Sequence, residues 1–149
     1  MMTVNKVRWA FRGAKGKYKV GDVVKDPIVA KVVSVSGDKV VLEFAATKIQ
    51  GIGAGGGKVW ANGLKIILNR EELNVEVKNK IIVDGSGEVA TLIKAKAVGA
   101  GGVVLTGDKI ISGLPIVRLS SQQMEMVKKL GKESNKIWLN GTSGKIFIT

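Results

Sequence analysis

Glycine divides this chain into short segments. Twenty glycines, against two prolines, separate apolar runs that are only a few residues long. Glycine readily adopts the positive φ values that tight turns need, and it destabilises a helix interior by about 1 kcal/mol relative to alanine. The pattern therefore indicates many tight turns and extensive β-structure. The apolar share of 45% is enough for a buried core. No apolar run approaches the ~20 residues of a membrane-spanning helix, so we expect no membrane insertion.

The residues before Lys80 show short strands separated by turns. Alternation of apolar and polar residues from Val40 to Phe44 predicts a strand with one buried face. Asn62-Gly63 is a strong hairpin signal. The predicted strands are Lys31–Val35, Val40–Phe44, Lys58–Trp60 and Leu64–Leu68. We expect this β-rich half, residues 1–79, to form a small barrel or sandwich.

After Asn79 the pattern changes to alternating strands and helices. Ser120 and Gln123 have the spacing of a capping box at the start of a helix, and Gly131 is expected to end that helix as its C′ residue. A second helix is predicted from Glu88 to Val98. The predicted strands are Ile81–Val83, Val103–Thr106, Leu114–Leu119, Lys136–Leu139 and Lys145–Thr149, the last two joined as a hairpin.

This order predicts an α+β protein. Right-handed crossovers between strands lead to a mainly parallel sheet of three or four strands in residues 80–149, with two helices. With both helices on one face, the second face of the sheet would be bare. We therefore expect the β-rich half, or a partner, to dock against it.

Residues 81–149 resemble a swivelling β/β/α domain, the class that includes protease-associated modules. The resemblance is carried by the helix-to-strand step Ala97–Leu105 and by Leu114–Leu119, a strand with proline near its start that leads into a helix. The segments Gly21–Val24 and Val32–Phe44 are similar to an SH3-like or barrel-sandwich β unit.

Over about four-fifths of its length, the chain is similar to a group of bacterial and archaeal proteins of unknown function. The similarity rests on a glycine-rich step, Ile49–Gly57, and a late turn, Leu139–Thr142. The resemblance implies a fold and a binding or scaffolding role. It supplies no catalytic residue.

The chain has no His and no Cys. It therefore lacks the side chain that titrates near neutral pH, a thiolate nucleophile, and the preferred ligands of zinc and copper. Pairs of carboxylates such as Glu71-Glu72 lack the spacing of a calcium loop. We expect no enzyme activity, no cofactor and no metal, and no small-molecule substrate is evident.

Basic residues outnumber acidic ones by twenty-four to twelve, a formal net charge of +12. Such a charge attracts polyanions, although a lysine-rich surface also serves solubility. The most basic segment lies at the N-terminus, where aromatic residues are interleaved with cations. The candidate nucleic-acid-binding residues are Lys6, Arg8, Trp9, Arg12, Lys15, Lys17 and Lys19. In the alternative interpretation Trp9 packs into the core and the charges line a solvated strand edge.

Two glycine-containing loops invite other interpretations. The string Gly51–Gly56 contains the letters GxGxxG, but a strand follows it where a dinucleotide fingerprint needs a helix. Asp84–Glu88 leads into a helix N-terminus, where an anion could bind, but Asp84 and Glu88 bring negative charge there and capping by Asp84 or Ser86 explains the segment fully.

The sequence leads to two functional hypotheses. The first is a non-enzymatic, cytoplasmic binding module that associates with nucleic acid through its basic β half. The alternative is a structural or self-assembling protein, a homo-oligomer built through its glycine-rich segment. The candidate self-association residues are Gly53, Gly55, Gly56, Gly57 and Trp60.

Overall fold

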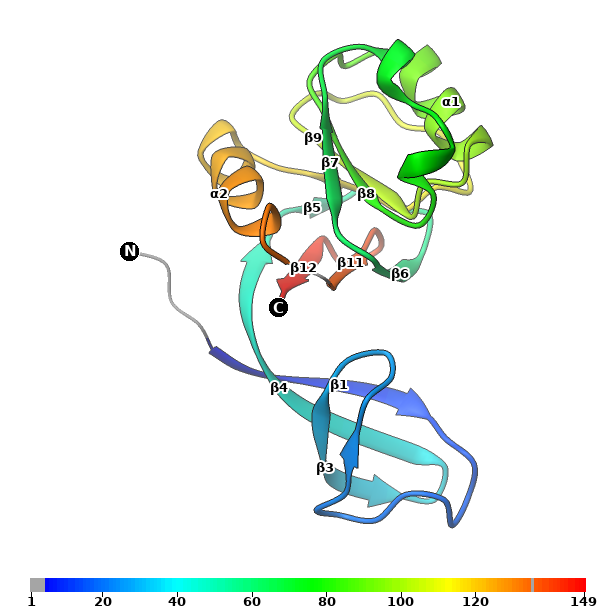
Figure 1. The fold of residues 1–149 in the computed structure, drawn as a ribbon, viewed down its shortest axis with the longest axis vertical. Coiled ribbons are helices and arrows are strands. Elements are labelled where there is room, and N and C mark those ends of the chain that lie inside the picture. The colour runs from blue at the N-terminus through cyan, green and yellow to red at the C-terminus, as the bar shows by residue number, and fades with distance from the viewer. Residues whose placement is uncertain (1–4, 135) are drawn as a thin grey trace. The chain divides into compact units, whose positions relative to one another are not determined.

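The protein has an α+β fold, as the sequence predicted, and its described residues form two α-helices and two β-sheets. The structure is a computed structural model that describes residues 5–134 and 136–149. Two compact units make up the chain, Met1–Thr47 and Lys48–Thr149 (Figure 1).

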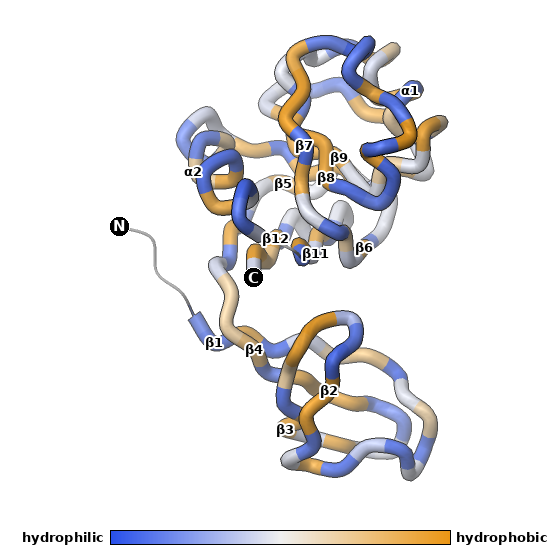
Figure 2. Tube along the Cα trace, in the orientation of Figure 1, coloured by the Kyte–Doolittle hydropathy of each residue, from blue (hydrophilic) through white to orange (hydrophobic). Residues whose placement is uncertain are grey.

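The first unit is an antiparallel sheet with the strand order β2-β3-β4-β1. Hydrophobic and hydrophilic residues alternate along its strands (Figure 2). Val32, Val40 and Leu42 are almost completely buried on one face of the sheet. The strands are β1 (Asn5–Arg12), β2 (Val23–Val24), β3 (Ala30–Ser36) and β4 (Lys39–Gln50), of which β4 continues into the second unit.

The second unit contains a mainly parallel sheet with the order β5-β10-β9-β8-β7. Strands β7 to β10 run parallel, and β5 is antiparallel to β10. Every residue of β8 and β9 is buried, as expected for a parallel sheet that is covered on both faces. The strands are β5 (Ile52–Gly53), β7 (Leu64–Ile67), β8 (Ile81–Asp84), β9 (Gly102–Leu105) and β10 (Ile116–Arg118).

The two helices lie on opposite sides of this sheet (Figure 1). The helix α1 (Val89–Ala97) packs on one face together with the 3-10 turns η1 (Arg70–Glu72) and η2 (Val75–Val77). The helix α2 (Ser121–Gly131) covers the other face together with strands of the antiparallel sheet. The prediction of two helices on one face, with the second face bare, was wrong, because each helix follows a different parallel strand and packs on a different side.

Antiparallel strands complete the second unit. The strand β11 (Ile137–Asn140) pairs with both β6 (Lys58–Ala61) and β12 (Lys145–Ile148), and β12 lies next to the end of β4. The hairpin predicted for β11 and β12 is confirmed. Asn62-Gly63 does not join a hairpin, since β6 pairs with β11 while β7 pairs with β8. This turn instead carries the chain from one sheet to the other.

The division between the units falls between Thr47 and Lys48, whereas the sequence suggested a boundary near residue 80. The reason is strand pairing over long distances in sequence. Strands β6 and β7, which look like a continuation of the β-rich half, add to sheets whose other strands come from the second half of the chain. Local patterns do not reveal such pairing.

Candidate functional site

The strand β1 separates its aromatic and cationic side chains onto opposite faces. Trp9 and Phe11 lie half-buried on the same side as Val7, whereas Lys6, Arg8 and Arg12 are exposed. The rings of Trp9 and Phe11 stack with their centroids 5.5 Å apart, and Trp9 lies opposite the fully buried Leu42. Period-two alternation in a strand produces this separation. The candidate residue Trp9 therefore belongs to the core side of the sheet.

Neighbouring strands extend the row of cations. Lys39 lies opposite Arg12, and Lys31 and Arg8 both lie opposite Glu43. Directly opposite residues in antiparallel strands share a face, so the sheet carries a basic face. We define this basic face as Lys6, Arg8, Arg12, Lys31 and Lys39, all exposed. Sequence reasoning missed Lys31 and Lys39, because only strand register places them beside β1.

Two carboxylates partly neutralise the basic face. The Nε of Arg8 lies 3.3 Å from Oε2 of Glu43, and Nη1 of Arg12 lies 3.6 Å from Oδ2 of Asp38. Both arginine side chains are mostly exposed, at 69% and 88%. Exposed ion pairs of this kind contribute only about 0–1 kcal/mol. A phosphate could therefore replace either carboxylate at little cost.

The remaining candidate cations lie in the loop after β1. Lys15, Lys17 and Lys19 are exposed, and the ammonium of Lys17 lies 5.5 Å from the centroid of the Tyr18 ring. The backbone N–H of Gly13 donates to the carbonyl of Asp38, which brings the start of this loop beside the β3–β4 turn. The loop that carries these lysines therefore starts next to Arg12 and Lys39, the last cations of the basic face.

The candidate self-association residues have roles inside the second unit. The N–H of Gly55 donates to the carbonyl of Gly141, and the N–H of Gly141 donates to the carbonyl of Gly57. A β-carbon at Gly53 or Gly56 would collide with backbone atoms of the 141–142 turn or of Leu114. Trp60 lies in β6 opposite Trp138. The glycines therefore allow backbone segments of the second unit to pack closely against one another.

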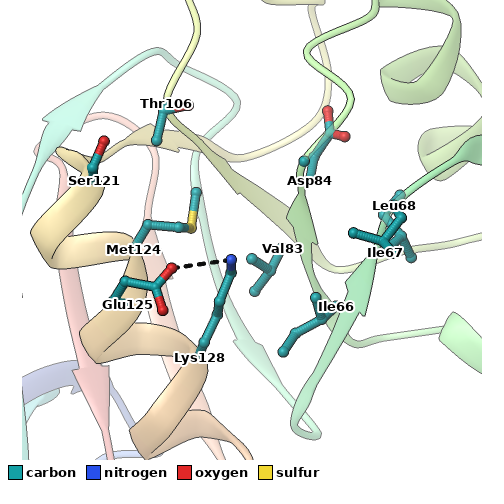
Figure 3. A pocket seen from close by; sticks show the side chains of 11 residues that line it. Ile66, Ile67, Leu68, Val83, Asp84, Thr106, Ser121, Met124, Glu125 and Lys128 are labelled. Carbon is teal, nitrogen blue, oxygen red and sulfur yellow. Dashed lines mark hydrogen bonds and ion pairs between the residues drawn. The ribbon is translucent and has the colours of Figure 1, made fainter.

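Two hollows open at the carboxyl end of the parallel sheet. The first, of about 220 Å³, lies between α2 and the ends of β7 and β8, with Ile66, Val83 and Met124 on its walls (Figure 3). The second, of about 350 Å³, lies beside the end of β10 and the start of α2. Thr106, directly after β9, lines both hollows. Ligands of open α/β sheets bind at this edge.

One charged side chain with an unpartnered buried atom lines each hollow. Asp84, which is 4% exposed, lines the first, and its Oδ2 has no hydrogen-bond partner among the described residues. Arg118 lines the second, and its buried Nε likewise has none there. Sequence analysis singled out the Asp84 loop but gave no reason to consider Arg118.

No membrane-crossing helix and no metal cluster occur in the part of the chain that the structure describes. None of its helices is long and apolar enough to span a bilayer. Within residues 5–134 and 136–149, no three His, Cys, Asp or Glu side chains come together as a metal site would require.

Comparisons with known proteins do not identify a family or a function for this chain. No protein-family model matches the sequence, and no curated protein matches it. Among solved structures, the chain is similar to BSAP, a zinc aminopeptidase from Bacillus subtilis, with 12% identity, a TM-score of 0.41, and coverage of 99% of this chain and 33% of that one. An aminopeptidase from Aneurinibacillus sp. strain AM-1 gives 12% identity, a TM-score of 0.41, and coverage of 98% and 35%. The chain thus spans about a third of the length of these enzymes, and so weak a likeness carries no argument about function.

Proposed function

We propose that this protein is a non-enzymatic binding module that associates with nucleic acid through the basic face of its first unit. The observation that carries the proposal is the alignment of five exposed cations on one side of the β3-β4-β1 sheet. The half-buried aromatic rings lie on the other side. Binding would therefore rest on phosphate contacts, with the bases left unread. The loop lysines Lys15, Lys17 and Lys19 would extend the contact.

The experiment compares two triple variants with the same change in net charge. The first replaces Lys6, Arg8 and Arg12 by Gln, and the control replaces the exposed Lys65, Lys109 and Lys129 of the second unit by Gln. Binding of a fluorescent single-stranded oligonucleotide is measured over a range of salt concentrations. Each lost phosphate contact lowers the slope of log K against log salt by about 0.7, so the first variant is expected to lose about 2 units of slope. The control should keep its slope, and equal losses in the two variants would contradict a localised site.

A second candidate function, self-assembly, is favoured by a different observation. Val20, Val23 and Val29 are 65–70% exposed, and Val23 lies on β2, the end strand of its sheet. Exposed apolar edge strands pair readily with other chains. Light scattering on nuclease-treated protein tests this candidate. A fixed multiple of 15.8 kDa would support it, and a monomer at high concentration would contradict it.

For the second unit we propose the swivelling β/β/α type to which its sequence is similar. The support is its layer order of a helix, a mainly parallel sheet, and an antiparallel sheet with α2. Modules of that class act as binding or scaffolding parts, which agrees with the absence of His and Cys from the sequence. We further propose the cytoplasm as its compartment, where nucleic acid is available to a basic protein.

A further inference from the structure

The strand β7 is an end strand of the mainly parallel sheet in the second unit, and among the described residues it pairs with β8 alone (Figure 1). The carbonyls of Ile67 and of Gly63, directly before β7, accept from N–H groups of β8 and of the residue that follows it. Backbone groups alternate in direction along a strand. The N–H and C=O groups of Leu64 and Ile66 therefore point away from β8.

The outward groups of these two residues have no hydrogen-bond partner in residues 5–134 and 136–149. Both residues are only partly buried. Leu68 is the next residue in the same alternation, and its N–H donates to Oε1 of Glu72 at 3.3 Å, so a carboxylate ends the free edge there. Leu64 and Ile66 thus each present one donor and one acceptor, which is what an added strand requires.

The side chains along this edge differ between the two faces of the sheet. Leu64 and Ile66 pack against the apolar cluster that includes Met124 of α2, and in Figure 3 Ile66 extends from β7 toward that helix. Ile66 also lines the first hollow, of about 220 Å³. Alternation places Lys65 on the opposite face, where it is exposed and forms no ion pair among the described residues. An added strand would meet apolar surface on one face and a cation on the other.

We propose that β7 binds an extended peptide, which adds to the free edge as an antiparallel strand. Antiparallel pairing uses both groups of each outward residue, because residues opposite Leu64 and Ile66 exchange two hydrogen bonds with them. Directly opposite residues also share a face. The matching peptide therefore has an apolar residue opposite Ile66, an acidic residue opposite Lys65 and an apolar residue opposite Leu64. This site lies in the second unit and is independent of the basic face.

A second copy of this chain fits the same edge less well. Two β7 strands paired antiparallel through Ile66 would place their Lys65 side chains on one face, as diagonal neighbours about 7–8 Å apart. Like charges at that spacing repel, and lysine on an edge strand commonly prevents pairing between copies. An acidic residue in a peptide would instead attract Lys65.

The probe is the capped peptide acetyl-Thr-Leu-Glu-Val-Thr-amide, titrated into the isotope-labelled full chain and followed by nuclear magnetic resonance. At saturation we expect hydrogen exchange of the Leu64 and Ile66 amides to slow by about tenfold or more, because each gains an acceptor. Exchange of the Lys65 amide, which faces β8, should change little. No shift of β7 signals at millimolar peptide, or binding without protection of these two amides, would overturn the proposal.

Two N-methylated peptides form a matched pair. A methyl group on the leucine nitrogen removes the N–H that donates to the carbonyl of Ile66, and it should weaken binding by about tenfold or more. A methyl group on the glutamate nitrogen removes an N–H that points away from β7, so the affinity should stay within about threefold of the parent peptide. Equal losses from the two methyl groups would overturn the proposal.

A charge exchange tests the face that carries Lys65. The Lys65→Glu variant should bind the peptide with lysine in place of glutamate about two- to fivefold more tightly than the parent peptide, the range for a cross-strand charge pair. Lys109→Glu, which is exposed and outside β7, is the control and should still prefer the parent peptide. If Lys65→Glu fails to fold, the methylated peptides decide the question on the unmodified protein. Light scattering that shows a dimer dissociated by the parent peptide would overturn the proposal in favour of a second copy.

Discussion

Gly141 lies where two backbone segments approach closely. It accepts a hydrogen bond from the N–H of Gly55 and donates one to the carbonyl of Gly57, both shorter than 3 Å. A β-carbon on Gly141 would collide with the carbonyl oxygen of Gly55 and come within 2.9 Å of the N–H nitrogen of Ile116. A backbone atom cannot swing aside as a side chain does. The residue is therefore required by the space around it, since its own φ is not in the left-handed region.

We expect Gly141→Ala to lower the free energy of unfolding by about 1–3 kcal/mol, the usual cost of overpacking. Urea denaturation followed by fluorescence measures this change. Gly107→Ala is the control, because a β-carbon there meets nothing within 4 Å and the φ is ordinary. The control should lie within about 0.5 kcal/mol of the unmodified protein, as surface substitutions do. Similar losses in both variants would show that the close approach has little effect.

Gly131 illustrates a different constraint at the residue scale. The sequence suggested a C′ residue beyond the helix end, but this prediction was wrong, because Gly131 is the last residue of α2 and is buried. A β-carbon there would collide with the side chain of Leu64. The glycine thus allows α2 to pack against β7. A sequence pattern does not distinguish a glycine needed for packing from one needed for a turn.

At the scale of elements, α2 begins with the capping box that its sequence predicted. The N–H of Gln123 donates to the hydroxyl of Ser120, and the side chain of Gln123 accepts from the N–H of Ser120. Gln123 also donates to the carbonyl of Gln50 at 2.7 Å, which attaches the first turn of the helix to the end of β4. The cap therefore positions α2 as well as starting it.

Ser120→Ala should lower the free energy of unfolding by about 1 kcal/mol, because it removes the acceptor for a backbone N–H at the helix start. Thermal unfolding monitored by circular dichroism at 222 nm measures the loss. Ser121→Ala changes the next residue, which is exposed and lies inside the helix. It should have little effect. A larger loss in Ser121→Ala than in Ser120→Ala would contradict the assignment of the cap.

At the scale of the molecule, the charge is spread over both units. Residues 1–47 carry nine Lys and Arg against four Asp and Glu, and residues 48–149 carry fifteen against eight. The first unit thus has the higher density of net charge, and its sheet collects cations on one face. Composition alone favours attraction of the whole molecule to polyanions, whereas the proposed localisation of binding to one face rests also on strand register.

Because Trp9 and Phe11 lie on the core side of the sheet, we expect nucleic-acid binding to be indifferent to base identity. Oligo-dT and oligo-dA of equal length should bind within about threefold of each other, since phosphate contacts carry no sequence information. Fluorescence anisotropy at one fixed salt concentration measures both affinities, and heparin should compete with each. A strong preference for one base would indicate that aromatic stacking contributes, contrary to the arrangement of β1.

The amino-acid pattern was sufficient for the α+β class, for the approximate position of most strands, for both helices, and for the cap at Ser120. One of its two interpretations of the N-terminal segment also placed Trp9 in the core and the cations on a solvated strand edge. These features depend on neighbours in sequence, through alternation, helical periodicity and capping. The candidate cations of the N-terminal segment also form a local pattern, and their role in binding stays a prediction.

The sequence pattern did not predict which distant segments of the chain pair with each other. The unit boundary at Thr47, the placement of α1 and α2 on opposite faces, and the addition of Lys31 and Lys39 to the basic face all depend on which strands lie side by side. So does the free edge of β7, since β6 pairs with β11 rather than with β7. Several strands could pair with the same hydrogen-bonding edge, and long-range contacts decide which one does. A local pattern of residues does not specify that choice.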